Sequence, residues 1–364
     1  MTDLDIKNYL PDFGKFANEQ EAITGDTSWK LMTPAATRAV LDNHVQTSPV
    51  MSFKNKIING NFDVWQRGES FTAAGFGPDR WRFSVTGSTF TSTRQAHPVG
   101  EELNGGGYFS RTVVNSIIGT GNYTAMEQKI EGVRTLAGKT ATLSFYAKAD
   151  APKSVAVEFI QNFGVGGSDT LFGIDVQTFN LTTSWQKYTA TVQLPSVSGK
   201  TIGEGDFVSV VLWFEAGSNL DARTNSLGHQ SGTFDIAQVQ LEEGPVATPF
   251  EQRPIGVEEM LCCRYYIGVP GKFGVEQLIN PVLYNNTRFL WGGVYPVKMR
   301  AVPSLTIRNQ QGVENQVSLY NMSLTSTTVS RLDSVTPMHL PVYLTTTDPL
   351  DGTIRLFWTA DAEL

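Results

Sequence analysis

Aromatic residues interleaved with amides are the part of the sequence best suited to binding chemistry. A sugar presents apolar C–H faces and hydroxyl groups. A site for it therefore pairs an exposed aromatic platform with side chains that donate and accept hydrogen bonds. The stretch on either side of Gly292-Gly293 gathers such residues within a short length of chain. We predict a glycan-binding site formed by Trp291, Tyr295, Tyr284, Asn285 and Asn286.

No comparable pattern points to catalysis or to a metal. The four histidines are far apart in the sequence, and none has the spacing of a zinc or iron ligand set. Two Gly-Lys-Thr stretches, at 138–140 and 199–201, lack the preceding glycine that a phosphate-binding loop needs. We therefore predict no catalytic residue, no metal and no cofactor. A pair of carboxylates for glycoside hydrolysis depends on the three-dimensional fold, so hydrolysis of a polysaccharide remains an alternative.

The composition is typical of a β-rich protein with an uncharged polar surface. Of the 364 residues, 40% are apolar, 17% are charged and 34 are glycines. The formal net charge is −7, so the chain lacks the basic surface that binds nucleic acid or an anionic membrane. No run approaches about 18 consecutive apolar residues, and membrane insertion is not predicted. The two cysteines, Cys262 and Cys263, are neighbours and are predicted to be reduced thiols.

Alternating apolar and polar residues predict the elements that must position these side chains. Residues 51–253 contain short strand-like runs separated by glycine, asparagine and serine clusters, which indicates a jelly-roll β-sandwich of about eight strands. The run 207–214 is apolar on both faces, as a central strand would be, and Trp213 within it is predicted to lie in the core. Residues 254–364 open with the run 257–266, which is expected to begin as a helical turn and to continue into a strand, and they predict a smaller C-terminal β-sandwich.

Residues 1–50 differ from the rest because the helical signals are concentrated there. Two short helices are expected, the second beginning after Thr33 with Pro34 at its first position. Helices this short cannot bury much surface alone, so they need a partner. We predict that this leader docks on another protein through Trp29, Val40 and Leu41.

Several segments resemble one family. The opening 55–68 (NKIINGNFDVWQRG) with Asp79-Arg80-Trp81, the middle 128–149 and the strand 233–244 (TFDIAQVQLEEG) resemble the jelly-roll domain of bacteriophage tail-fibre and receptor-binding proteins. Two later segments, 263–266 and 296–301, resemble the C-terminal domain that often follows. The segment from Phe16 to Pro34 resembles a repeat of fibre leaders.

This resemblance implies a structural fibre or spike subunit of the virion, made in the host cytoplasm. Its leader would bind other phage structural proteins, and its C-terminal domain would bind a host cell-surface polysaccharide. A homotrimer without enzymatic activity is expected, with no nucleic acid partner. Two alternatives remain: a head-fibre or decoration protein without a receptor role, and a surface-polysaccharide depolymerase.

The same domain is distantly similar to jelly-roll carbohydrate-binding modules, which often hold a structural calcium. The acidic residue that follows the Asn-Gly-x-Phe opening of those modules is matched by Asp63. The paired aspartates of their last strand are replaced by Ala237 and Gln238, so no calcium is predicted. The resemblance also implies a buried scaffold of indoles and ion pairs, in which Asp79 pairs with an arginine.

Overall fold

A computed structural model gives the fold of most of the chain. It describes residues 53–100, 103, 105–269, 274–279, 282–285, 288–291, 294–319, 326–333, 336–338, 342–346 and 354–364, together with Thr37 alone. Trp29, Val40 and Leu41 lie outside the described residues, and so does Asn286. No helix within the described part is long and apolar enough to cross a membrane.

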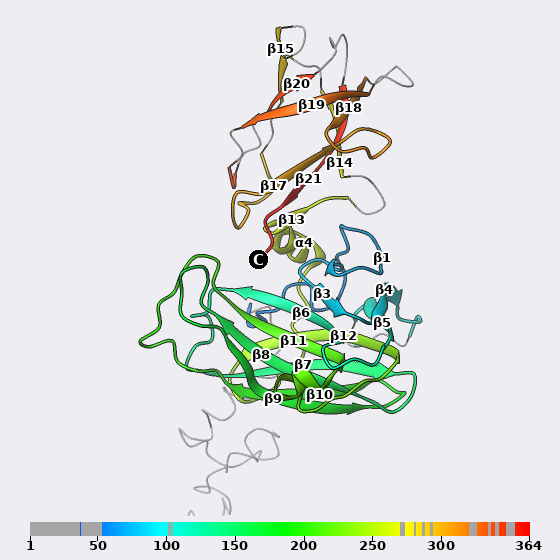
Figure 1. Ribbon diagram of the computed structural model, residues 1–364, viewed down its shortest axis with the longest axis vertical. Coiled ribbons are helices and arrows are strands. Elements are labelled where there is room, and N and C mark those ends of the chain that lie inside the picture. The colour runs from blue at the N-terminus through cyan, green and yellow to red at the C-terminus, as the bar shows by residue number, and fades with distance from the viewer. Residues whose placement is uncertain are drawn as a thin grey trace, which may run out of the picture.

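Residues 53–251 form a β-sandwich, hereafter the sandwich (Figure 1). Its strands are β1 (Ser70–Phe71), β2 (Gly75–Phe76), β3 (Arg82–Thr86), β4 (Thr89–Ala96), β5 (Tyr108–Asn115), β6 (Tyr123–Glu131), β7 (Thr140–Ala149), β8 (Lys153–Asn162), β9 (Leu171–Leu181), β10 (Gln186–Gln193), β11 (Phe207–Ala216) and β12 (Gly232–Glu243). Two short helical segments, η2 (Ser218–Leu220) and α3 (Asp221–Thr224), lie between β11 and β12.

The described strands of the sandwich form two six-stranded antiparallel sheets. The first has the order β1-β4-β5-β12-β7-β10, and the second has the order β2-β3-β6-β11-β8-β9. Successive strands repeatedly change sheet, as expected for a jelly roll. There are more strands than the eight expected, partly because the two-residue strands β1 and β2 extend each sheet at one edge. The predicted mainly β sandwich fold is confirmed.

The core lies between the two sheets and follows the period of two along each strand. In β11, Val208, Val210, Leu212 and Phe214 face inward. They meet Leu143, Phe145 and Ala147 from β7 in the facing sheet. Val211 and Trp213, which alternate with these residues, belong to a separate apolar cluster on the outer face of the second sheet. The second sheet therefore has apolar side chains on both faces.

Residues 254–364 form the C-terminal unit, which begins with helix α4 (Ile255–Cys263). Its strands are β13 (Tyr266–Ile267), β14 (Val275–Ile279), β15 (Val282–Asn285), β16 (Arg288–Trp291), β17 (Ser304–Arg308), β18 (Gln316–Leu319), β19 (Ser326–Asp333), β20 (Val342–Thr346) and β21 (Ile354–Asp361). Hydrogen bonds join these nine described strands into one connected sheet, in which β21 pairs with β13, β14, β17 and β18. Its small core includes Met299, Ile354, Leu356 and Trp358.

The C-terminal unit stands on the sandwich beside β3 and β6, with the end of the described chain between them (Figure 1). Arg80, only 2% exposed, connects the two. Its guanidinium lies 3.5 Å from the ring centroid of Tyr265, pairs with Glu363, and donates a hydrogen bond to the carbonyl of Lys129 at 2.6 Å. Burial lowers the pKa of Arg80 to about 10, so the side chain remains charged at neutral pH.

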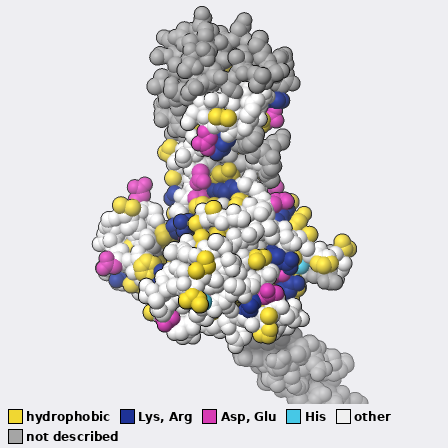
Figure 2. Space-filling model, turned by 45° about the vertical axis from the view of Figure 1, so that its right-hand side comes forward, with side chains coloured by type: hydrophobic (Ala, Val, Ile, Leu, Met, Phe, Trp, Pro, Cys, Tyr) yellow, Lys and Arg dark blue, Asp and Glu magenta, His cyan; other side chains and the backbone are white. Residues whose placement is uncertain are grey.

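A second arginine, Arg67, makes the same kinds of contact between the two units. Arg67 stacks over the ring of Tyr266 at 3.6 Å and reaches Asp361 and Glu363, each at 3.3 Å. Both arginines therefore lie on neighbouring tyrosines and both pair with Glu363. We call Arg67, Arg80, Tyr265, Tyr266 and Glu363 the interface cluster. On the face shown in Figure 2, acidic and basic side chains gather where the two units meet, whereas most of the remaining surface is uncharged.

The scaffold implied by the resemblance is found in part. Trp65 and Trp81 are buried indoles, as expected. The partner of Asp79 is Gln66, which donates hydrogen bonds to the carboxylate from its backbone N and from Nε2, at 2.7 Å each. Arg80 forms its ion pair with Glu363 and not with Asp79. The expected Asp79–arginine pair is therefore wrong. The acidic partner of Arg80, Glu363, is almost 300 residues away in the sequence, so no local pattern of residues could predict this pair.

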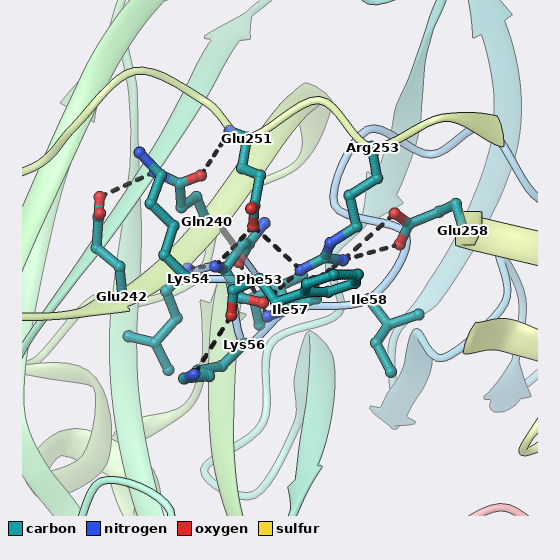
Figure 3. Close-up of polar contacts among 12 residues, drawn as sticks. Phe53, Lys54, Lys56, Ile57, Ile58, Gln240, Glu242, Glu251, Arg253 and Glu258 are labelled. Atoms are coloured by element: carbon teal, nitrogen blue, oxygen red, sulfur yellow. Dashed lines mark hydrogen bonds and ion pairs between the residues drawn. The ribbon is translucent and has the colours of Figure 1, made fainter. Parts of the chain in front are cut away.

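The chain enters and leaves the sandwich at one place, drawn in Figure 3. Arg253, with a side chain only 3% exposed, donates to the carbonyls of Asn55 and Ile57 and pairs with Glu251 and Glu258. The carboxylate of Glu251 also accepts from the backbone N of Asn55 at 3.0 Å. This Arg253 junction ties the entering segment to the segment after β12 and to α4.

Candidate functional site

A cleft of about 180 Å³ opens on the outer face of the second sheet. Residues of β3, β6, β11 and β8 line its base, and residues of β9 and α3 stand at one side. The lining residues are Ser84, Tyr123, Ala125, Glu127, Ile160, Asn162, Thr170, Phe172, Phe207, Val211, Trp213 and Arg223. A small concave site with apolar walls and a few polar groups is the usual form of a ligand site.

The base of the cleft is apolar because the alternate residues of three central strands face outward there. Trp213 lies beside Ala125 of β6, and Val211 lies in register with residues of both β6 and β8. Ile160 completes this surface. The ring of Tyr123 packs edge-on against the Trp213 indole, with 5.4 Å between centroids. Together these residues give an aromatic and aliphatic surface beneath the opening.

A buried carboxylate holds the indole in place. Glu158 of β8 is fully buried, and its Oε2 accepts from Trp213 Nε1 at 3.1 Å. Arg223 donates from Nε to Oε1 at 2.8 Å and from Nη2 to Oε2 at 2.9 Å. The backbone N of Gly173 donates to Oε1 at 2.8 Å. Four hydrogen bonds use all the acceptor positions that a carboxylate offers.

Local backbone irregularities bring Phe172 and Arg223 to the cleft. The pairing of β8 with β9 shifts register on both sides of Phe159, which alters the path of β9 near Phe172. Helix α3 ends at Asn225 in the left-handed conformation, and its Arg223 reaches back over the sheet. The guanidinium lies 4.6 Å from the ring centroid of Phe172 and 5.0 Å from that of Trp213. Phe172 remains 55% exposed, so its ring is available to a ligand.

A second glutamate lies in the same row of the sheet. Glu127 and Glu158 are both in register with Val211, so two strand spacings, about 9.6 Å, separate their Cα atoms. Glu127 pairs with Arg82 at 3.1 Å and accepts from the hydroxyl of Ser209 at 3.2 Å. Each glutamate of this row therefore has an arginine partner.

Comparison with known proteins finds similar solved structures but no matching family model and no matching curated protein. A structure described as CBM4 is 22% identical over 51% of this chain and 98% of its own, with a TM-score of 0.31. A family 11 carbohydrate-binding module from Clostridium thermocellum, in complex with a mixed-linked tetrasaccharide, is 14% identical over 48% of this chain and 96% of its own, with a TM-score of 0.29.

The enzymatically active domain of tailspike protein 4 from bacteriophage CBA120 is also similar. It is 15% identical, with a TM-score of 0.32, and the match covers 54% of this chain but only 22% of the tailspike chain. Likenesses at these TM-scores say nothing about what this chain binds. The properties of the cleft itself must support any function.

Of the five predicted glycan-binding residues, Tyr295 does not form an exposed platform. Tyr295 is 3% exposed, lies in the core of the C-terminal unit and has its ring 6.0 Å from that of Trp358. Tyr284, Asn285 and Trp291 lie on the paired strands β15 and β16. A role for these last three and for Asn286 remains a prediction. Trp213 is buried as predicted, but on the outer face of its sheet and not between the sheets.

A serine, a histidine and a glutamate also meet at one end of the sandwich. His229 Nδ1 lies 2.7 Å from Glu215 Oε2 and 3.1 Å from Ser116 Oγ. In a catalytic triad the serine and the acid contact different ring nitrogens, so that the imidazole can pass on a proton. Here both contact Nδ1, while Nε2 faces the backbone of Gly119. This arrangement suits a structural role in holding the loop 116–122.

The residues around Asp63 do not fit the calcium site of the carbohydrate-binding modules that the sequence resembles. Burial raises the pKa of the Asp63 carboxyl, and Asn61 donates to it at 3.0 Å. At the position of the missing aspartates, Gln238 directs an amide N–H donor toward the carbonyl of Leu103. Calcium takes six to eight oxygen ligands, and a donor group in their midst opposes it. Within the described residues, no three histidine, cysteine, aspartate or glutamate side chains gather in a metal-binding group.

Proposed function

We propose that this protein binds a glycan in the cleft of the second sheet, as a fibre or spike subunit that attaches a phage particle to a host surface. The main support is the cleft itself, in which the half-exposed ring of Phe172 lies with the partly exposed Arg223 and the polar side chains of Asn162 and Thr170. Val211 and Trp213 are themselves at most 4% exposed, so the apolar area that a ligand could still cover is the ring of Phe172. A pyranose ring would cover it and would reach Asn162 and Thr170 with its hydroxyls.

The fibre and its trimeric state rest on the sequence resemblance. A trimer would present three clefts, and multivalency can raise a weak affinity by about 10²–10⁴ when the geometry permits. Light scattering at micromolar concentration should give a mass near three times the chain's 39.9 kDa. A mass of a single chain would overturn the trimer without affecting the cleft.

A glycan array probed with the purified chain tests binding. We expect binding to be weakened about tenfold by Phe172→Ala, a loss of about 1.4 kcal/mol, with the melting temperature unchanged because the ring is half exposed. Phe53→Ala is the matched control, since Phe53 is 51% exposed and does not line the cleft. A wild-type chain that binds no glycan, or equal effects of the two variants, would overturn the proposal.

A depolymerase is the second candidate, because Glu127 of the cleft and the buried Glu158 share one row of the sheet. A glycosidase needs one carboxyl group free to give its proton to the leaving oxygen. Glu158 has no acceptor position left, and both glutamates are paired with arginines. This arrangement favours binding. Release of reducing ends from an array-positive polysaccharide, abolished by Glu127→Gln, would instead support hydrolysis.

A further inference from the structure

Glu158 connects the two side chains of the cleft that differ most in chemistry, the Trp213 indole and the Arg223 guanidinium. Its partners come from three different elements: Trp213 from β11, Arg223 from α3 and Gly173 from β9. With four hydrogen bonds accepted, the carboxylate has no capacity left for a ligand. It therefore acts on a ligand only through the groups that it holds.

The charge of the cleft follows from the same contacts. Arg223 makes a bidentate pair with Glu158, and Arg82 pairs with Glu127. Arg223, the cation among the residues that line the cleft, is thus offset by a carboxylate at 2.8 Å. The ammonium of Lys129 lies 4.5 Å from the ring centroid of the lining residue Phe207 and donates to the carbonyl oxygen of Leu364. An acidic sugar needs an uncompensated cation to replace the water lost from its carboxylate, and an uncharged sugar does not.

We propose that Glu158 is the positioning residue of the cleft: it orients Trp213 and Arg223 and cancels the charge of Arg223, so that the cleft selects uncharged sugars over acidic ones. This inference rests on the proposed glycan-binding function and specifies its ligand class. The half-exposed Phe172 ring supplies the apolar contact, and the buried indole supports the base of the cleft. The guanidinium, stacked between Phe172 and Trp213, supplies hydrogen-bond donors without net charge.

The test compares Glu158→Gln with Glu215→Gln. Glu215 is equally buried and holds His229, Ser116 and Thr124, none of which lines the cleft. Both variants remove a buried charge, so they should lower stability in a similar way. Only Glu158→Gln should change the ligand preference.

The probes are β-1,4-linked glucohexaose and the hexamer of glucuronic acid with the same linkage, together with an array holding other neutral and uronate-containing pairs. We expect the wild type to bind the neutral member at least about tenfold more tightly by calorimetry. Glu158→Gln should lose most of that preference because Arg223 becomes an uncompensated cation. The double variant Glu158→Gln/Arg223→Gln should restore it, since both charges are then absent.

A signal from Trp213 tests the positioning role without any ligand. In protein containing 5-fluorotryptophan, the Trp213 ¹⁹F resonance, identified by its loss in Trp213→Phe, should be single and narrow. It should broaden or split in Glu158→Gln but not in Glu215→Gln. Equal spectra for the two variants would overturn the positioning role. If the wild type prefers acidic sugars, the proposed ligand class alone is overturned. If the wild type binds none of the sugars, the proposed function itself is overturned.

Discussion

Asp79 lies almost fully buried next to the interface cluster, and its carboxyl group responds to that burial. Removal from water raises its pKa from 3.8 to about 6, although Arg67 and the hydrogen bonds from Gln66 act in the opposite direction. The folded protein therefore binds a proton more readily than the unfolded chain between pH 4 and 6. Asp79 thus makes stability fall as the pH rises through this window.

Substitution of Asp79 by asparagine should remove this contribution. We expect the difference in unfolding free energy between wild type and Asp79→Asn to shift in favour of the wild type when the pH falls from 7 to 4.5. A pKa raised by about two units corresponds to at most about 3 kcal/mol. Urea unfolding of both proteins at each pH measures the difference. A gap that is constant with pH would contradict the raised pKa.

Gly60 shows how tightly the opening segment is packed. Its carbonyl accepts from the backbone N of Val239 at 2.8 Å, and a Cβ added to it would collide with the carbonyl oxygen of Val239. We expect Gly60→Ala to cost about 1–3 kcal/mol, because backbone cannot move aside as a side chain can. Gly107→Ala is the control, since nothing lies within 4 Å of its added Cβ. Thermal unfolding compares the two, and equal melting temperatures would contradict the close approach.

At the scale of elements, the Arg253 junction should matter more than any exposed ion pair. Arg253→Met would leave Glu251 and Glu258 buried without their cation, and such a loss costs about 3–5 kcal/mol. Lys139→Met is the control, because its pair with Glu243 is exposed on both sides and should contribute about 0–1 kcal/mol. Chemical denaturation measures both. A small effect of Arg253→Met would show that the junction does not hold the segments together.

The strands show what could be predicted from the sequence. The alternation in 207–214 predicts a central strand, and β11 has that place in the second sheet. Alternation alone does not reveal which face meets the other sheet when both faces are apolar. Trp213 was therefore expected in the core. The outer face of a two-layer sandwich should be polar, so a strand with two apolar faces was the available signal of the cleft.

Other parts of the cleft left no signal in the sequence. Glu158 and Arg223 are 65 residues apart, and their pairing depends on the irregular path of β9 and on the short helix α3. Helix α4 was different, because its helical turn and the following strand are encoded locally and both were predicted. Tyr295 was predicted as a platform from its glycine neighbours, but β21 covers it through Trp358.

For the whole molecule, the interface cluster should make the sandwich and the C-terminal unit move as one body. Glu363→Gln would leave Arg80 buried with its charge uncompensated, which favours separation of the units. Spin labels on Ser198→Cys and Ser304→Cys, both at exposed positions, would report the distance between the units. Burial raises the pKa of the Cys263 thiol to about 11, so the native cysteines should react slowly with the label.

We expect one narrow distance distribution for the wild type and a broad one for Glu363→Gln. Glu243→Gln, in the exposed pair with Lys139, serves as the control and should keep the narrow distribution. A broad distribution already in the wild type would mean that the units are not fixed to each other. An unchanged distribution in Glu363→Gln would mean that other contacts, such as Arg264 with Glu131, are sufficient.

The Arg253 junction also has a mechanical consequence. The chain enters the sandwich at residues 53–57 and leaves it at 251–258, and both stretches meet at this one side chain. A pulling force applied to residues before Phe53 and to the C-terminal unit would pass directly across the junction. The two sheets of the sandwich would lie outside that line of force. Tension on the chain would therefore load one arginine and its hydrogen bonds before it could peel apart a strand or deform the cleft.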